Sequence, residues 1–325
     1  MTSIIAVLVS FLVTVLVGRF LIPALRALKF GQSIREIGPT WHNSKQGTPT
    51  MGGIMFISGC LIAMLCSIPA IVSGDYTYPV VFCFSLIFGI IGFLDDFIAI
   101  KHKRNLGLTE IQKLLLQLLV SGLYLLLLRH MGHLSTELYI PFFNTTIHIP
   151  WVIYLLLSVF IIVGSVNAVN LTDGVDGLCS SVTVPVMLFF MVCAALWGRS
   201  GTAAFAGAVL GGLLGFLVYN HHPAKVFMGD TGSLYLGSTV CGLAYMLDMP
   251  LILILVGIIY ICEALSDIIQ VTYFKLTHGK RIFKMAPLHH HFEKCGWSEV
   301  KIVVVFTSVT VIFCLLAWLG VMNRF

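Results

Sequence analysis

Charged side chains are scarce in this 325-residue sequence: Asp, Glu, Lys and Arg make up 10% of it, and hydrophobic residues 58%. A soluble domain keeps about 25% charged residues, so a water-soluble fold is excluded and lipid is the expected solvent. The alternating ten-residue segments of a membrane β-barrel are also missing. We predict an all-α polytopic membrane protein of about ten transmembrane helices, forming a single domain over residues 1–325. Apolar runs near the 20 or so residues that a spanning helix needs lie at 3–22, 51–70, 79–97, 110–131, 150–168, 176–197, 201–219, 232–248, 250–274 and 301–321.

Positive charge is sparse in every second connection between these segments. Of the 19 Lys and Arg residues, only Arg129, Arg199 and Arg324 fall on one side, and the remainder fall on the other. By the positive-inside rule the basic side is cytoplasmic, so both termini are predicted to be extracytoplasmic. This topology accounts for the net charge of +5, and no nucleic-acid partner is needed to explain it.

Two local patterns predict how parts of the chain pack. Gly207, Gly211 and Gly215 recur every four residues, a spacing that lets helix backbones approach closely in membranes. The sequence leaves open whether this stripe serves internal packing or a dimer interface. The alternating stretch 140–150 predicts a small hairpin on the extracytoplasmic side.

Five aspartates lie beside predicted helix ends on the cytoplasmic side: Asp95 and Asp96 after the third segment, Asp173 and Asp176 after the fifth, and Asp230 after the seventh. Acids at a membrane are costly unless they are paired, hydrated or metal-bound. Each alone could cap a helix or pair with a lysine, but five in three glycine-bearing segments favour a metal site. Carboxylate oxygens suit Mg²⁺ or Mn²⁺. Adjacent helical residues point about 100° apart, so we expect Asp95 and Asp96 to have different roles.

Lysines share the face predicted for these acids. A metal beside several ammonium groups is what a pyrophosphate-bearing substrate requires, because the metal polarises bridging oxygens and the lysines neutralise the remaining charge. Glycines in the same segments would let the backbone approach the phosphates. We therefore predict a cytoplasmic active-site cleft for a diphosphate substrate. The lysines on this face are Lys45, Lys103, Lys113 and Lys225.

The last large loop carries three consecutive histidines, His289, His290 and His291. Three readings remain open: a substrate or phosphate contact, since imidazole can donate to phosphate near neutral pH; a solvated loop without a chemical role; and zinc held by His291 and Cys295, although the usual paired-ligand spacing is absent. The preceding segment carries polar residues on one helical face, which must point at protein or water, and a bent or broken helix lining a groove is expected there. These residues are Glu263, Ser266, Asp267 and Gln270.

Together these motifs resemble those of the polyprenyl-phosphate N-acetylhexosamine-1-phosphate transferases. The Asp95-Asp96 pair and the segments 170–178 and 227–233 are similar to motifs found across that superfamily. The segments Gly47–Gly53 and Ala286–His291 are more particular to its phospho-N-acetylmuramoyl-pentapeptide transferase branch. The resemblance implies transfer from UDP-MurNAc-pentapeptide to undecaprenyl phosphate, giving lipid I and UMP, with Mg²⁺. It also implies ten helices, a cytoplasmic cleft in the bacterial cytoplasmic membrane, surrounding membrane lipid, and a homodimer.

Roles carried over by this resemblance follow the matching motif positions. Asp230 is the implied Mg²⁺ ligand. The implied catalytic residues are Asp95, Asp96, Asp173, Asp176 and His289. The implied substrate-binding residues are Lys45, Thr50, Lys103, Lys113, Asn170, Asn220, Phe227, His290 and His291. One departure is Asp267, where an apolar residue would be expected.

Other functions predict different patterns. A sister transferase using UDP-GlcNAc would keep the carboxylate motifs but lack the three histidines. A secondary transporter would place ionisable residues near the bilayer midplane and show repeats, and an intramembrane metalloprotease would carry His-Glu-x-x-His, which is absent. For the transferase, two routes remain open: direct attack by the acceptor phosphate, or a covalent phosphoryl-aspartate.

Overall fold

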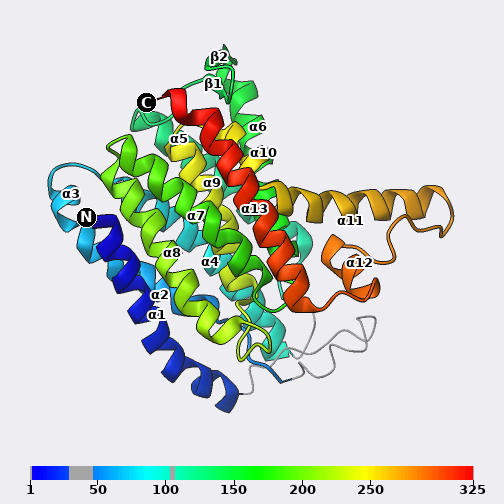
Figure 1. Cartoon of the computed structure of the whole chain (residues 1–325). Helices are drawn as coiled ribbons and strands as arrows, with labels where there is room; N and C mark the ends of the chain where they lie inside the picture. Colours follow the sequence, from blue (N-terminus) through cyan, green and yellow to red (C-terminus); the bar gives the residue numbers. More distant parts are fainter. Residues whose placement is uncertain (1, 29–46, 103–106, 325) are drawn as a thin grey trace.

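The structure is a computed structural model that describes residues 2–28, 47–102 and 107–324, and it is a bundle of long helices (Figure 1). A two-stranded antiparallel hairpin caps one end, pairing Ile140 with Thr145, as the alternating stretch predicted. The long helices are α1 (Thr2–Ala27), α2 (Gly53–Ala63), α4 (Thr77–His102), α5 (Glu110–His130), α6 (Trp151–Thr172), α7 (Leu178–Leu196), α8 (Ser200–Asn220), α9 (Gly229–Met246), α11 (Ile258–Leu276) and α13 (Glu299–Val321). The short elements are α3 (Ile68–Val72), α10 (Leu253–Val256), α12 (Leu288–Lys294), β1 (Glu137–Ile140) and β2 (Thr145–His148).

The structure confirms the all-α, multi-pass architecture. Among the described residues, 8 helices are long and apolar enough to cross a membrane, or up to 9 if one bent pair counts as a single span. The expected segment 232–248 is α9, which is buried along its length from Thr231 to Met246 and packs against α4 and α6. Because protein rather than lipid surrounds it, α9 carries Gly, Ser and Thr where a lipid-facing helix would carry larger apolar residues.

The glycine stripe of α8 serves internal packing. A Cβ at Gly211 would lie 2.0 Å from the carbonyl oxygen of Val7 in α1, and one at Gly207 would lie 2.7 Å from that of Ser3. The two helices run side by side in the same direction, so their backbones touch where side chains are missing. The stripe is therefore covered by α1 and does not form a homodimer interface; the homodimer itself stays a prediction.

The predicted break in the ninth segment is present. α10 and α11 meet at an angle of 80° around Gly257, and α11 projects sideways from the bundle above α12 (Figure 1). Glu263, Ser266 and Gln270 form the polar part of its buried face, as predicted, whereas Asp267 is partly exposed.

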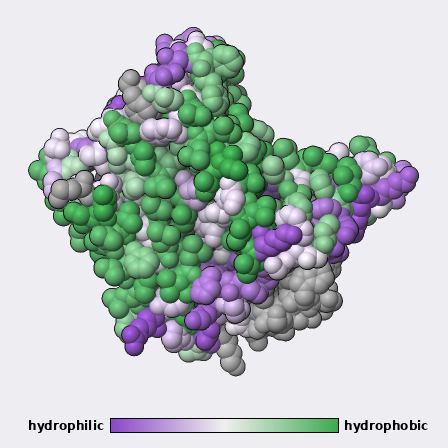
Figure 2. Space-filling model, in the orientation of Figure 1, coloured by the Kyte–Doolittle hydropathy of each residue, from purple (hydrophilic) through white to green (hydrophobic). Residues whose placement is uncertain are grey.

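The three basic residues that were predicted to be extracytoplasmic lie at the hairpin end of the bundle. Arg199 and Arg324 line a cavity there with Asp248, and Arg129 lies 4.0 Å from the ring of Trp151 at the start of α6. Figure 2 shows apolar residues covering the middle of the bundle, with hydrophilic residues at the hairpin end, at the opposite end and along the α11 arm. A membrane-embedded belt between two polar ends follows from this arrangement.

At the hairpin end, Asp75 joins two helix starts. It accepts hydrogen bonds from the backbone N–H of Thr77 (3.1 Å), the N–H of Gly201 (2.9 Å) and the hydroxyl of Ser200 (3.2 Å). Burial raises the pKa of Asp75, but the hydrogen bonds from Thr77, Gly201 and Ser200 outweigh it, so the pKa lies below its ordinary value. The carboxylate therefore caps the N-terminal ends of both α4 and α8.

Candidate active site

Asp230, in the first turn of α9, is the centre of the candidate site. Its carboxylate contacts the ammonium group of Lys113 from α5 and accepts a hydrogen bond of 2.8 Å from the amide of Asn170 in α6. The same Lys113 Nζ lies 3.7 Å from Oδ2 of Asp95 in α4. The side chains of Lys113, Asp95 and Asp230 remain 18%, 17% and 26% exposed, so an incoming ligand can reach them. Four helices thus bring a lysine, an amide and two carboxylates together.

Asp96 faces α9 instead. Its carboxylate accepts hydrogen bonds from the backbone N–H groups of Asp230 (3.2 Å) and Thr231 (3.0 Å), and from the Thr231 hydroxyl (2.7 Å). The first N–H groups of a helix have no partner within it, and a negative charge there is favoured by the helix dipole. The two adjacent carboxylates thus face different partners: Asp95 faces Lys113, and Asp96 holds the start of α9. Their separate roles in a reaction stay a prediction.

Close backbone approach is what allows α4 and α9 to meet here. A Cβ at Gly92 would lie 2.1 Å from the carbonyl oxygen of Asp230, so any larger residue would push the two helices apart. Gly229 has a φ of +68°, which favours glycine, and a Cβ there would meet Asp96 and Thr50 at 2.6 Å. Both glycines set the position of the Asp230 backbone.

The loop before α9 is tied to the segment before α2. Phe227 donates its N–H to the carbonyl of Pro49 (2.8 Å) and accepts from the N–H of Gly52 (2.8 Å). Asn220 is buried and donates to the carbonyl of Val226 at 2.9 Å. The predicted substrate-binding residues Phe227 and Asn220 therefore shape this loop. Thr50, also predicted, lies against Gly229, whereas Lys45 and Lys103 lie outside the described residues.

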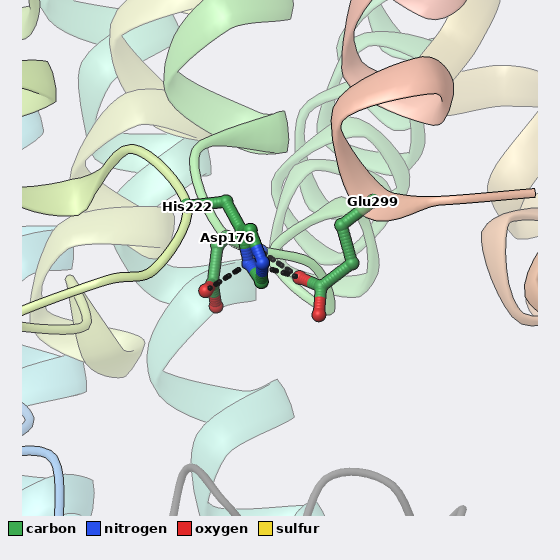
Figure 3. A group of neighbouring side chains, drawn as sticks. All are labelled: Asp176, His222 and Glu299. Atoms are coloured by element: carbon green, nitrogen blue, oxygen red, sulfur yellow. Dashed lines mark hydrogen bonds and ion pairs between the residues drawn. The ribbon is translucent and has the colours of Figure 1, made fainter.

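The two aspartates of segment 170–178 separate. Asp173 ends α6 and is partly exposed. Asp176 is 4% exposed and belongs to a second cluster with His222 and Glu299, drawn in Figure 3. Within the described part of the chain, these three form the group whose metal-ligating atoms all lie within 4.8 Å of one another. The sequence singled out Asp176 alone, because no local pattern links it to His222 and Glu299.

His289 is buried against the turn that follows α6. Its Nδ1 lies 3.0 Å from Oε2 of Glu263 in α11, and its Nε2 has no hydrogen-bond partner among the described residues. A Cβ at Gly174 would lie 2.2 Å from that Nε2. The first histidine of the motif is thus held by an acid on the bent helix and pressed against the turn that carries Asp173 and Asp176.

The other two histidines make local contacts. Nδ1 of His290 lies 2.6 Å from Oε2 of Glu293, and Nδ1 of His291 accepts from the N–H of Lys284 at 3.1 Å. Nε2 of His291 lies 3.7 Å from Sγ of Cys295. That pair supplies two possible zinc ligands, and within the described residues no third metal-ligating side chain joins them.

Comparison with known proteins agrees with this geometry. The model of glycosyl transferase family 4 matches residues 78–248, which span α4 to α9 and hold Asp95, Lys113, Asn170 and Asp230. The fold and the site therefore define a multi-pass membrane enzyme of the transferase class. The first signature of the phospho-N-acetylmuramoyl-pentapeptide-transferases matches residues 45–57.

Curated relatives narrow the class further. A protein of Clostridium acetobutylicum named phospho-N-acetylmuramoyl-pentapeptide-transferase is 51% identical to this chain, over 97% of this chain and 98% of the relative. The corresponding proteins are 49% identical in Clostridium botulinum and 46% identical in Caldicellulosiruptor bescii, over 97% of this chain and 95% and 96% of theirs. This chain belongs to the phospho-N-acetylmuramoyl-pentapeptide-transferase family.

Proposed function

We propose that this chain transfers phospho-MurNAc-pentapeptide from UDP-MurNAc-pentapeptide to undecaprenyl phosphate, giving lipid I and UMP. The names of relatives about half identical over nearly the whole chain support this reaction. The single structural observation that carries it is the cluster of Lys113 and Asn170 with the carboxylates of Asp95 and Asp230 at one end of the bundle. Such a cluster suits a substrate whose reacting part is a pyrophosphate.

We also propose that the reaction uses Mg²⁺, with Asp230 as the side chain that would hold it. The donor chemistry fits, because its carboxylate offers oxygen ligands and already faces one cation, Lys113. Bound Mg²⁺ would polarise the pyrophosphate oxygens. Lys113 would then neutralise charge on the departing UMP, and Asn170 would keep the Asp230 carboxylate oriented through its 2.8 Å hydrogen bond.

Direct attack by the acceptor is the route that we propose. The second pKa of a phosphate monoester is about 6, so the acceptor is largely dianionic at neutral pH and needs little help from a base. Its oxygen attacks the sugar-linked phosphorus, the bond from that phosphorus to the UMP oxygen breaks, and Asp95 can accept the remaining acceptor proton. A phospho-aspartyl enzyme trapped with donor in the absence of acceptor would contradict this route.

Glu263 is proposed to position His289. With Nδ1–H donating a hydrogen bond to the Glu263 carboxylate, the orientation of the ring is fixed and Nε2 faces the turn that contains Gly174. Glu263 would act through His289 and not on the substrate itself.

The active site is proposed to face the cytoplasm of a bacterium, in its inner membrane. The Lys and Arg distribution along the chain supports this side. Both termini would then lie on the outer side.

Release of UMP by detergent-purified protein tests the reaction. The protein receives Mg²⁺, undecaprenyl phosphate and either UDP-MurNAc-pentapeptide or UDP-GlcNAc, and a lipid-linked product is sought by mass spectrometry. Release with the muramoyl donor alone supports the proposal. Release with UDP-GlcNAc would place the chain's activity in the sister branch, and release with neither donor would contradict transferase activity.

A further inference from the structure

We propose that Asp176, His222 and Glu299 form a second divalent-metal site, separate from Asp230, that prefers Zn²⁺ over Mg²⁺. The three residues come from the turn between α6 and α7, the loop between α8 and α9, and the first turn of α13 (Figure 3). One imidazole nitrogen with two carboxylates is a donor set for transition metals, whereas Mg²⁺ favours oxygen ligands alone. This proposal does not depend on the transferase reaction.

The spacing of the ligand atoms matches a metal ion. Nδ1 of His222 lies 3.0 Å from Oδ2 of Asp176 and 3.6 Å from Oε2 of Glu299. Two ligands on a tetrahedral Zn²⁺, each at about 2.0–2.1 Å, are separated by about 3.3 Å. The two observed distances lie on either side of that value, so an ion could be bound with only small side-chain movements.

The surroundings hold two of the ligands in place. The backbone N–H of Ala224 donates to Oδ2 of Asp176 at 3.0 Å, and the N–H of Asp176 donates to Oε2 of Glu299 at 3.1 Å. Hydrogen bonds of this kind orient carboxylates around metals. The side chain of Asp176 is 2% exposed, that of Glu299 13% and that of His222 42%, so the cluster is closed on the protein side and open to solvent at the imidazole.

A metal here would join the two loops that carry the active-site helices. The turn holding Asp176 follows directly after α6, the helix of Asn170, and the loop holding His222 precedes α9, the helix of Asp230. Glu299 adds the start of α13. The bound ion would therefore stabilise the end of the bundle that carries the reaction, and a metal that binds only the folded chain raises the unfolding temperature.

Zinc binding to purified, chelator-stripped protein tests the site by isothermal titration calorimetry and by measurement of bound metal after gel filtration. Wild type is compared with His222→Gln, Glu299→Gln, Asp230→Asn and Cys295→Ser, and with His222→Cys, which keeps a zinc ligand. We expect one equivalent of Zn²⁺ and a raised unfolding temperature in wild type, Asp230→Asn, Cys295→Ser and His222→Cys. The same equivalent is lost in His222→Gln and Glu299→Gln.

Three results would overturn the proposal. One is no stoichiometric Zn²⁺ uptake by wild type, and another is undiminished uptake by both His222→Gln and Glu299→Gln. The third is loss of uptake in Cys295→Ser alone, which would assign the zinc to His291 and Cys295. Retention in His222→Cys guards against misfolding as the cause of loss, because that variant perturbs the same position while keeping a ligand.

Discussion

Replacing Asp96 with asparagine tests whether this residue positions α9 or acts on the substrate directly. The carboxylate accepts three hydrogen bonds from the start of α9, including one from the N–H of Asp230. Asparagine keeps one acceptor oxygen and turns an NH₂ group toward the helix donors. One lost charge-assisted hydrogen bond costs about 1.5–3 kcal/mol, and the lost charge at the helix N-terminus costs about 0.3–1 kcal/mol.

Together these changes weaken the interactions that hold the start of α9 by roughly 2–4 kcal/mol. Because these interactions place the Asp230 carboxylate, we expect kcat/KM to fall by up to the corresponding factor of roughly 30 to 700. We expect Asp96→Asn to need more Mg²⁺ for half-maximal UMP release and to unfold at a lower temperature than wild type. Asp267→Asn, which neutralises a partly exposed acid on α11, serves as the control. A fall in kcat with an unchanged Mg²⁺ requirement and unfolding temperature would refute the reasoning, because Asp96 would then act on the substrate directly.

Three further predictions follow from contacts around the site and at the hairpin end. Gly174→Ala places a Cβ 2.2 Å from Nε2 of His289 and should reduce UMP release at least tenfold. The control Gly164→Ala, where a Cβ meets nothing within 4 Å, should leave the rate unchanged, and equal rates in the two variants would contradict the packing argument. Glu263→Gln should lower kcat and shift the pH profile of UMP release, since the amide cannot hold the His289 imidazole as the carboxylate does, and a pH profile identical to wild type would count against that pairing. Asp75→Asn should lower the unfolding temperature at pH 7, because a carboxyl whose pKa is lowered on folding stabilises the folded state above its unfolded pKa of about 3.9. The difference in unfolding temperature between variant and wild type should narrow as the pH falls below about 4, and a difference that stays constant down to pH 3 would contradict this reasoning.

The sequence predicted those parts of the fold that depend on local composition. Apolar runs indicate the helices because a helix that crosses the lipid hydrocarbon needs about 20 apolar residues. The spacing of Gly207, Gly211 and Gly215 indicates a close helix contact, but only the structure shows that its partner is α1. α9 was expected as one more spanning segment. Hydropathy cannot show that a helix is enclosed by its neighbours, and α9 owes its burial to α4 and α6.

For the candidate site, aspartates could be found from sequence but their partners could not. Asp230 and Lys113 stand out because each is a charge beside an apolar segment. His222 and Glu299 do not, since they lie 46 and 123 residues from Asp176 and follow no recognised spacing. Glu263 was assigned to a polar helix face, but its contact with His289, 26 residues away, depends on how the chain after α11 turns back and places α12 against that helix.

The most direct test of the active-site assignment is UMP release by Asp230→Asn with UDP-MurNAc-pentapeptide, undecaprenyl phosphate and Mg²⁺, alongside its unfolding temperature. Asp230 meets Lys113 and Asn170 where α4, α5, α6 and α9 converge. We predict that the variant stays folded and loses at least 99% of the wild-type rate at any Mg²⁺ concentration. A folded variant that releases UMP at the wild-type rate would contradict the placement of the reaction at this carboxylate.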